Sequence, residues 1–191
     1  MSKFFHKCII ITAPSGAGKT SITRYLMNEF PELAFSVSAT TREPRTNEKP
    51  DLDYYFITVD DFKQKIQKKE FIEWEMVYEG KYYGTLKQEL ERIWAVDKLP
   101  VLDIDVQGAI HVQQQYPSTT ISIFIQPPSI EELKKRLEGR GSETAKSLEA
   151  RINKAAYELS FYHYFENVIV NKDFDIACAE AKQIVQHFID N

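Results

Sequence analysis

Residues 13–20 read APSGAGKT, and this stretch decides the fold. It follows a β-branched apolar run, KCIIIT at residues 7–12, which is typical of a buried strand. After it, Ile22, Leu26 and Phe30 recur at a spacing of four, which predicts a helix that ends at a proline. Strand, glycine loop and helix in this order form a P-loop, whose backbone N–H groups bind phosphate. The alternative is a loop that only joins a strand to a helix.

One position departs from the usual pattern G-x-x-x-x-G-K-[ST], because Ala13 replaces the first glycine. Ala13 precedes Pro14, and a residue before proline is pushed to extended geometry with negative φ, which alanine adopts without strain. Gly16 and Gly18 still supply the permissive backbone that a close approach to phosphate needs. We therefore expect the substitution to leave the loop intact.

Cationic and acidic side chains complete a predicted phosphate and metal site. Lys19 is placed to reach the β- and γ-phosphates, and Thr20 to offer its hydroxyl to Mg²⁺. Residues 99–105 (LPVLDID) are typical of an apolar strand that ends in two aspartates on one face, Asp103 and Asp105. Two carboxylates buried together need cations or donors, which favours a Mg²⁺ site. The alternative is that the aspartates only cap the next helix.

Arginines gather in two further places. Arg42 and Arg45 lie three residues apart beside a proline turn, Arg136 and Arg140 lie in KKRLEGR, and Arg151 follows. Guanidinium groups suit phosphate oxygens, although a solvated charged surface is the alternative for each cluster. The residues alone thus predict a site for Mg²⁺ and a nucleoside triphosphate, with phosphoryl transfer, and they do not name the acceptor.

The rest of the chain alternates predicted strands with predicted helices. Buried strands are expected at residues 101–104, 121–125 and 168–170, and helices at 86–95, 106–114, 129–139, 144–161 and 175–188. This order predicts an α/β fold of three layers, with a central parallel sheet flanked by helices. Two segments interrupt this alternation of strands and helices and are interpreted as insertions. They are a mixed lobe at residues 34–85 with one helix near 60–69, and a charged helical segment at 127–151.

Composition excludes several classes of protein. The 191 residues carry a net charge of -4, which argues against a broad nucleic-acid surface. No apolar stretch approaches membrane-spanning length, and Cys8 and Cys178 lie far apart without metal-binding spacing. We expect one cytoplasmic domain with reduced cysteines and no nucleic-acid or membrane partner, as a monomer or a homo-oligomer.

The motifs together resemble the guanylate kinase family. They are APSGAGKTS, SVSATTREPR, DYYF, FIEWEMVYEGKYYGT, VLDIDVQG, LKKRLEGRGSET and VIVN, in family order from about residue 8 to 171. The resemblance implies a P-loop nucleoside monophosphate kinase that transfers the γ-phosphoryl group of ATP to GMP, and to dGMP, in purine metabolism and GMP recycling, with Mg²⁺ as cofactor. It implies a core of residues 1–33, 86–126 and 152–191, a GMP-binding lobe at 34–85 and a lid at 127–151.

The resemblance also implies a role for each matching position. The implied ATP-binding residues are Ala13, Pro14, Ser15, Gly16, Ala17, Gly18, Lys19 and Thr20, with Asn171 near the adenine. The implied metal ligands are Thr20 and Asp103. The implied GMP-binding residues are Arg42, Arg45, Tyr54 and Tyr83 at the phosphate and Ser38, Glu73, Thr85 and Asp105 at the base. The implied catalytic residues are Lys19, Arg136, Arg140 and Arg151.

The sequence pattern alone favours a different interpretation for some of these positions. Glu73 lies in an alternating strand and would be a solvated residue, while Tyr54 and Tyr83 would be half-buried sheet aromatics. Guanine, however, offers N1–H and an amino group as donors, which suit a carboxylate. Adenine has no N1–H and would leave that carboxylate unpaired.

Two departures and two alternatives accompany the resemblance. Asn47 and Asp51 stand where the family usually has glycine, so the loop TNEKPDLDY is expected to be stiffer or differently shaped. One residue is inserted near the hairpin at residues 78–81. The alternatives are a non-catalytic guanylate-kinase-like interaction domain, which Lys19 and the arginines disfavour, and a kinase for AMP, UMP or dTMP, which Glu73 disfavours.

Overall fold

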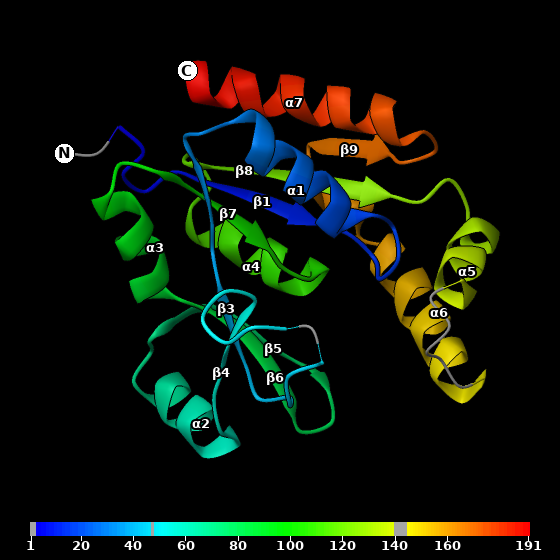
Figure 1. Ribbon diagram of the computed structural model, residues 1–191, viewed down its shortest axis with the longest axis horizontal. Helices are drawn as coiled ribbons and strands as arrows, with labels where there is room; N and C mark the ends of the chain where they lie inside the picture. The colour runs from blue at the N-terminus through cyan, green and yellow to red at the C-terminus, as the bar shows by residue number, and fades with distance from the viewer. Residues whose placement is uncertain (1–2, 47, 140–144) are drawn as a thin grey trace.

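The computed structural model describes residues 3–46, 48–139 and 145–191 (Figure 1). Its centre is a five-stranded parallel sheet in the order β2-β7-β1-β8-β9. The strands are β1 (Cys8–Thr12), β2 (Leu33–Phe35), β7 (Leu99–Asp103), β8 (Thr120–Gln126) and β9 (Asn167–Val170). Their apolar runs are nearly continuous because helices cover both faces of a parallel sheet.

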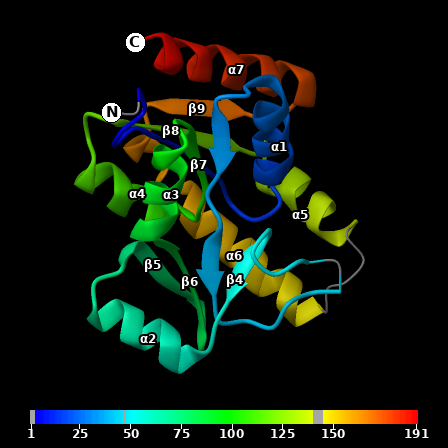
Figure 2. The same ribbon diagram turned by 60° about the vertical axis from the view of Figure 1, so that its left-hand side comes forward.

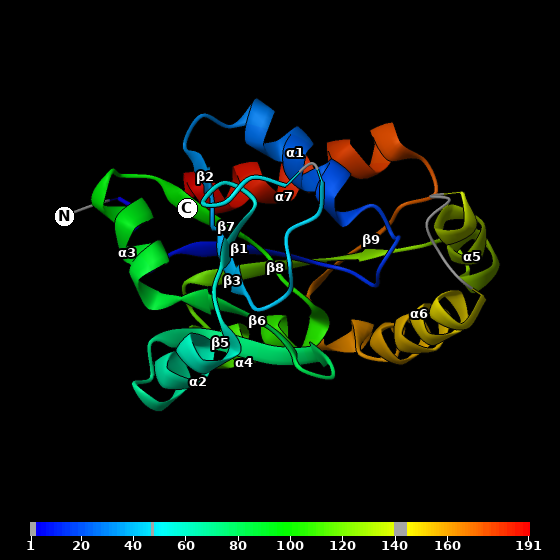
Figure 3. The same ribbon diagram turned by 60° about the horizontal axis from the view of Figure 1, so that its bottom comes forward.

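Helices flank this sheet on both sides, which confirms the predicted three-layer α/β fold. Figures 1 and 3 show α1 (Lys19–Glu29) and α7 (Phe174–Asp190) on one face, and α3 (Lys87–Ala95) and α4 (Val106–Gln115) on the other. Ile22 and Leu26 of α1 are fully buried against the strands, as their spacing predicts. The P-loop joins the end of β1 to the start of α1, so it lies at the carboxyl end of the central strand.

A second, four-stranded sheet forms the inserted lobe, in the order β4-β3-β6-β5. Its elements are β3 (Ser38–Thr40), β4 (Tyr54–Phe56), α2 (Val59–Gln67), β5 (Phe71–Tyr78) and β6 (Lys81–Leu86). β3 pairs parallel with β4 and antiparallel with β6, so the lobe is mixed, as expected. It has a small core of its own, in which the Phe62 and Phe71 rings stack with centroids 4.3 Å apart.

The chain enters the lobe later than the sequence suggested. Ala34 and Phe35, which we assigned to the lobe, belong to β2 and pair with Pro100 and Val101 of the core sheet. Only Ser36 and Val37 separate β2 from β3. In Figure 2 the two short strands follow one another down the view, from the core sheet into the lobe. One apolar run in the sequence therefore serves two different sheets.

The charged helical insertion contributes α5 (Ile130–Glu138), and α6 (Ala145–Leu159) packs beside it (Figure 1). The hydroxyl of Ser129 accepts a hydrogen bond from the backbone N–H of Glu132, so the predicted cap is confirmed. A short 3-10 helix, Tyr162–Tyr164, follows α6. Thr144, where we expected the longer helix to begin, lies outside the described residues.

Three smaller expectations can be compared with the structure. The hairpin turn between β5 and β6 is present, and its Gly80 has a φ of 69°. Cys8 and Cys178 are buried free thiols, and burial raises the pKa of Cys8 to about 11. Within the part of the chain that the structure describes, no helix has the length and apolar character needed to cross a membrane.

Asp51 occupies one of the two positions where we expected glycine. Its φ is 65°, in the left-handed region that glycine tolerates best and that aspartate visits more readily than most residues. The backbone at Asp51 therefore has a conformation that glycine also adopts readily. Asn47 lies outside the described residues.

Candidate active site

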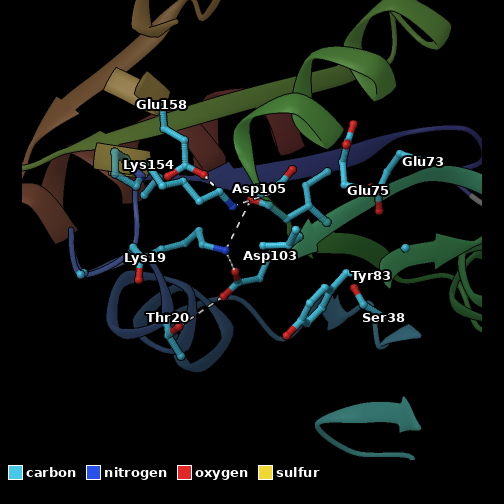
Figure 4. Close-up of a pocket in the computed structure, with 18 of the residues that line it drawn as sticks. Lys19, Thr20, Ser38, Glu73, Glu75, Tyr83, Asp103, Asp105, Lys154 and Glu158 are labelled. Atoms are coloured by element: carbon cyan, nitrogen blue, oxygen red, sulfur yellow. Dashed lines mark hydrogen bonds and ion pairs between the residues drawn. The ribbon is translucent and has the colours of Figure 1, made fainter. Parts of the chain in front are cut away.

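A cavity of about 280 Å³ lies between the P-loop, the carboxyl end of β7, the lobe and α6 (Figure 4). It brings together side chains that are far apart in the sequence. Of the residues predicted from the sequence, those that line it are Ala13, Pro14, Ser15, Gly16, Gly18, Lys19, Thr20, Ser38, Tyr54, Glu73, Tyr83, Asp103 and Asp105. The predicted phosphate site and the predicted base site therefore share one cavity.

The P-loop has the backbone that the sequence predicts. Gly16 and Gly18 have φ angles of 93° and 105°, which only glycine adopts readily. Ala13 is not among the described residues with positive φ, so alanine is unstrained there, as its place before Pro14 requires. Gly18 directly precedes α1, whose first residue is Lys19. The backbone N–H groups of the loop thus lie at the positive end of an eleven-residue helix.

The side chains of Lys19, Thr20 and Asp103 lie close together next to the P-loop (Figure 4). Lys19 Nζ forms an ion pair with Asp103 and lies 3.4 Å from the carbonyl oxygen of Ile104. Thr20 Oγ1 lies 3.5 Å from Asp103 Oδ2. Burial favours the neutral form of Lys19, but the Asp103 carboxylate outweighs it and raises the pKa of Lys19. Lys19 is therefore charged, and it is held by a carboxylate where a nucleotide phosphate is expected.

The same oxygens fit a divalent cation. Hydroxyl and carboxylate oxygens are hard ligands of the kind that Mg²⁺ prefers, and Mg²⁺ usually takes only one or two protein groups plus substrate phosphates. No cluster of three His, Cys, Asp or Glu side chains suited to a metal occurs among the residues that the structure describes. Thr20 and Asp103 thus match a cation that arrives with a nucleotide rather than one held in an all-protein cage.

Arg42 lies beside two aromatic residues of the cavity wall, Tyr54 and Tyr83, and its guanidinium group makes several contacts. Its two terminal nitrogens donate to the two carboxylate oxygens of Glu48, each over 2.6 Å, and its Nε donates to Tyr83 Oη over 3.1 Å. The Tyr54 ring lies under it, 4.9 Å from the guanidinium carbon. Arg45, by contrast, has a side chain that is 78% exposed, with its nearest carboxylate oxygen, on Glu48, at 4.0 Å.

Glu48 was missed by the sequence analysis. Its carboxylate occupies the fork of Arg42 with the same bidentate geometry that a phosphate would use. The hydrogen bonds that Arg42 donates hold the pKa of Glu48 below its usual value. The only signal in the sequence is an acidic residue in the loop after the two arginines, and such residues are common on surfaces.

Glu73 is buried in the cavity wall, so the pattern-only interpretation of a solvated strand residue is wrong. Its side chain accepts a hydrogen bond from Thr85 Oγ1 over 2.6 Å, across the β5–β6 pair. Burial raises the pKa of Glu73 to about 7, the hydrogen bonds of Thr85 oppose this, and the Asp105 carboxylate adds to it. A buried carboxylate with few donors is ready to accept hydrogen bonds from a ligand.

Asp105 has two roles in the geometry. It is the N-cap of α4, where its Oδ1 accepts the N–H of Gly108 over 3.0 Å, so the helix-capping interpretation is correct for this aspartate. It also lines the cavity, and its Oδ2 lies 3.9 Å from Lys154 Nζ. Lys154 in turn lies 3.2 Å from Glu158, which is 5% exposed and whose pKa burial raises.

Lys154 and Glu158 of α6 line the cavity too, and the sequence analysis missed both (Figure 4). Their spacing of four on a helix is typical of an exposed ion pair, which carries no functional signal. Only the position of α6 across from the P-loop turns this pair toward the cavity.

Of the predicted lid arginines, Arg151 contacts the P-loop, whereas Arg136 contacts Asn171 and its own helix. The side chain of Arg151 donates to Ser15 Oγ over 2.5 Å, and Arg136 donates to the backbone carbonyl of Asn171 over 3.1 Å and to Glu132 over 3.3 Å. Neither arginine is part of the cavity wall as described. Arg140 lies outside the described residues.

Asn171 supports the P-loop from behind. Its side-chain Nδ2 donates to the carbonyl oxygen of Ala17 over 2.8 Å, and the residue is 5% exposed. A Cβ on Gly18 would lie 2.2 Å from that nitrogen, so Asn171 and the glycine are in close contact. The structure places this side chain against the backbone of the loop, and its position near an adenine stays a prediction.

A P-loop that faces a buried carboxylate across one cavity, with an arginine fork beside two tyrosines of the cavity wall, defines a P-loop kinase with a separate acceptor pocket. A model of the family described as guanylate kinase matches residues 5–188. The chain belongs to the guanylate kinase family and is an enzyme, an ATP:GMP phosphotransferase.

Individual relatives agree with this family. The chain is 46% identical to a guanylate kinase of Bacteroides fragilis over 183 residues, which cover 96% of this chain and 90% of that protein. It is 42% identical to a guanylate kinase of Porphyromonas gingivalis, with coverage of 96% and 98%. The crystal structure of guanylate kinase from Anaplasma phagocytophilum superposes with a TM-score of 0.77 at 30% identity, covering 95% of this chain and 85% of that one.

Proposed function

We propose that the cavity binds both substrates at once, with the ATP phosphates at the P-loop and GMP between Glu73 and Arg42. The observation that carries this proposal is the single cavity whose walls include both Lys19 and Glu73. With the two nucleotides in one enclosure, the γ-phosphoryl group passes directly to an oxygen of the GMP phosphate, in line with the leaving ADP. No covalent intermediate on the enzyme is needed, so positioning and charge neutralisation supply the catalysis.

At the ATP end, the loop N–H groups and Lys19 hold the β- and γ-phosphates. Lys19 must then exchange its ion pair with Asp103 for the phosphate oxygens. Thr20 and Asp103 are the residues that would hold Mg²⁺, which supplies neutralisation of the phosphate charge when it is bound. Asn171 acts through the loop, by fixing the carbonyl of Ala17.

At the acceptor end, Glu73 receives the N1–H and amino donors of guanine. Thr85 holds one oxygen of Glu73 from the other side, and Ser38 and Asp105 line the same region. A base without N1–H leaves the buried carboxylate without donors, which disfavours adenine. Arg42, Arg45, Tyr54 and Tyr83 are the groups for the GMP phosphate. Five of these residues come from β-strands of one sheet, namely Ser38, Tyr54, Glu73, Tyr83 and Thr85.

The lid residues Arg136, Arg140 and Arg151 close over the transferring phosphoryl group. Arg151 already contacts the P-loop through Ser15, which supports its place in this set. Closure also excludes water, which would otherwise compete with GMP as acceptor. The division into core, GMP-binding lobe and lid, and a cytoplasmic location, remain part of the proposal.

One assay tests the acceptor pocket. ADP formation is measured with ATP and Mg²⁺ and each of GMP, dGMP, AMP, UMP and dTMP, for the unchanged protein and for Glu73→Gln. We expect GMP and dGMP to be preferred, and the substitution to raise the KM for GMP about 100-fold, since a buried ligand donor loses its partner. Equal turnover with AMP, or an unchanged KM for GMP in Glu73→Gln, would contradict the proposed pocket.

A further inference from the structure

Gly108 is the third residue of α4, and its backbone gives no reason for glycine. Its φ lies outside the left-handed region, and its N–H makes an ordinary capping bond to Asp105. Inside a helix, glycine is less stable than alanine because it loses more backbone entropy on folding. A residue that weakens its own helix without a backbone need points to a requirement for space.

The space belongs to Glu73. A Cβ on Gly108 would lie 2.6 Å from Oε2 of Glu73 and 3.1 Å from its carboxyl carbon, whereas ordinary contact begins at 3.4 Å. The next neighbour, Asp105 Oδ1, is at that ordinary distance. The first turn of α4 therefore accommodates the Glu73 carboxylate at a point where any side chain would displace it.

The carboxylate is confined from the opposite side as well. Thr85 Oγ1 donates to its other oxygen over 2.6 Å, and Glu73 as a whole is 6% exposed. The carboxylate thus lies between Thr85 and the helix, with the cavity on its remaining side. A methyl group on Gly108 would move Oε2 by most of an ångström relative to anything bound in that cavity.

We infer that Gly108 is a positioning residue for acceptor specificity: by carrying no side chain, it sets where the Glu73 carboxylate meets the base of GMP. This inference rests on the proposed role of Glu73 in reading guanine. Displacements of about 1 Å can reduce enzymatic efficiency about 100-fold even when no reacting group is removed. The added methyl group would clash only with the end of one flexible side chain, so we expect the fold to accommodate it. Recognition of the GMP base, which depends on the position of that carboxylate, is expected to weaken.

Gly108→Ala tests the inference. We expect the KM for GMP to rise 10- to 100-fold, with kcat at saturating GMP and the KM for ATP each within twofold, because ground-state and transition-state binding of the base weaken together. The matched control is Gln114→Ala, an exposed position on the same helix, which should change none of these values. A KM for GMP within twofold of the unchanged protein would overturn the inference.

A double-mutant cycle with Glu73→Ala separates this role from a structural one. If Gly108 acts through Glu73, then adding Gly108→Ala to Glu73→Ala changes the KM for GMP less than twofold. The added alanine also raises the melting temperature, since the methyl group now has room in a helix. Two results would overturn the inference: a KM for GMP in the double variant tenfold above that of Glu73→Ala, or a melting temperature below that of Glu73→Ala. This comparison stays decisive even if Gly108→Ala alone fails to fold.

The same cycle distinguishes failure of the inference from failure of the proposed function. If Glu73→Ala alone leaves the KM for GMP unchanged, the proposed role of Glu73 in the acceptor pocket is wrong. The inferred role of Gly108 is then wrong as well. If Glu73→Ala raises that KM and Gly108→Ala does not, only the role of Gly108 is wrong.

Discussion

The two terminal nitrogens of Arg42 donate to the two carboxylate oxygens of Glu48, at 2.6 Å each. The side chains are only 9% and 16% exposed, so water competes weakly for this pair. Glu48 therefore neutralises and orients the predicted phosphate-binding arginine.

This pair predicts a pH-dependent loss of stability in Glu48→Gln. The pKa of Glu48 is below its usual value of 4.5 in the folded protein, so the ionised pair stabilises the fold above that pH. We expect Glu48→Gln to lower the free energy of unfolding by about 1–3 kcal/mol at pH 7, the range for a charged hydrogen bond in a partly buried site.

The advantage of Glu48 should shrink as the pH falls below 4.5, where the carboxylate takes up a proton first in the unfolded chain and then in the folded one. Urea unfolding at several pH values measures it. Glu43→Gln, an exposed carboxylate in the same loop, is the control and should stay within about 0.5 kcal/mol. A constant difference between pH 7 and pH 4 would argue against the ion pair.

Glu73→Gln should stabilise the protein while it weakens GMP binding. The folded pKa of Glu73, about 7, lies above its usual value of 4.5, so the folded state binds the proton more tightly than the unfolded state. Stability that depends on this proton is lost as the pH rises from 4.5 to 7. Glutamine carries no charge, so the variant escapes the loss and should gain up to about 3 kcal/mol above pH 7.

Thermal unfolding of the two proteins at pH 4.5, 6 and 8 checks the sign. The melting temperatures should nearly coincide at the lowest pH and separate as the pH rises. Exposed Glu79→Gln, in the hairpin turn, serves as the control and should follow the unchanged protein throughout. If Glu73→Gln were less stable at pH 8, internal donors would have to satisfy the carboxylate better than the structure indicates.

Lys19→Met should abolish transfer and also destabilise the fold. Loss of one donor to the developing phosphate charge reduces kcat by about 1000-fold or more. Asp103, whose side chain is 13% exposed, then loses its cation, so the free energy of unfolding should fall by about 1–3 kcal/mol at pH 7.

The double variant Lys19→Met/Asp103→Asn separates the two effects. It should recover stability, because no unpaired carboxylate remains, and it should stay inactive. Retained activity in Lys19→Met would refute the role of the lysine, and a double variant less stable than the single one would refute the ion pair as the source of the loss.

Asn171→Ala should raise the KM for ATP about tenfold and leave the KM for GMP within twofold. The substitution removes the buried hydrogen bond to Ala17 and opens space beside Gly18, which loosens the loop and costs about 1–2 kcal/mol of stability. The control is Asn167→Ala, at the start of β9, the strand that ends directly before Asn171; its side chain donates to the carbonyl oxygen of Ser122, away from the loop. That variant should lose similar stability with no change in either KM.

The P-loop could be predicted because its determinants are local. Strand, loop and helix follow one another, and the φ angles of Gly16 and Gly18 depend on residues next to them. The alternation of strands and helices likewise fixed the layers of the core. The role of Glu73 could be predicted only from the resemblance to a family, because an alternating strand has the same sequence pattern whether its second face is exposed to water or packed against protein.

The remaining contacts depend on pairs that no local pattern encodes. Asn171 meets Ala17 across 154 positions, and Glu48 meets Arg42 only because the loop between them folds back. The division of one apolar run between β2 and β3 depends on which sheet offers a free edge. Asn171 could not be predicted because its partner is distant in sequence, and Glu48 and the two short strands because the local sequence does not specify how the chain folds around them.

The lobe is joined to the core at two places without spare chain. It is entered through Ser36 and Val37 alone, and it is left where β6 ends at Leu86 and α3 begins at Lys87. At the first joint, the N–H of Val37 is held by Glu89 Oε1 over 3.0 Å. The lobe also contacts the core through two side-chain hydrogen bonds: Gln115 donates to the carbonyl oxygen of Ile72 over 2.7 Å, and Tyr55 Oη donates to Glu89 over 2.9 Å. Any rotation of the lobe about its two chain connections therefore has to break or exchange these bonds.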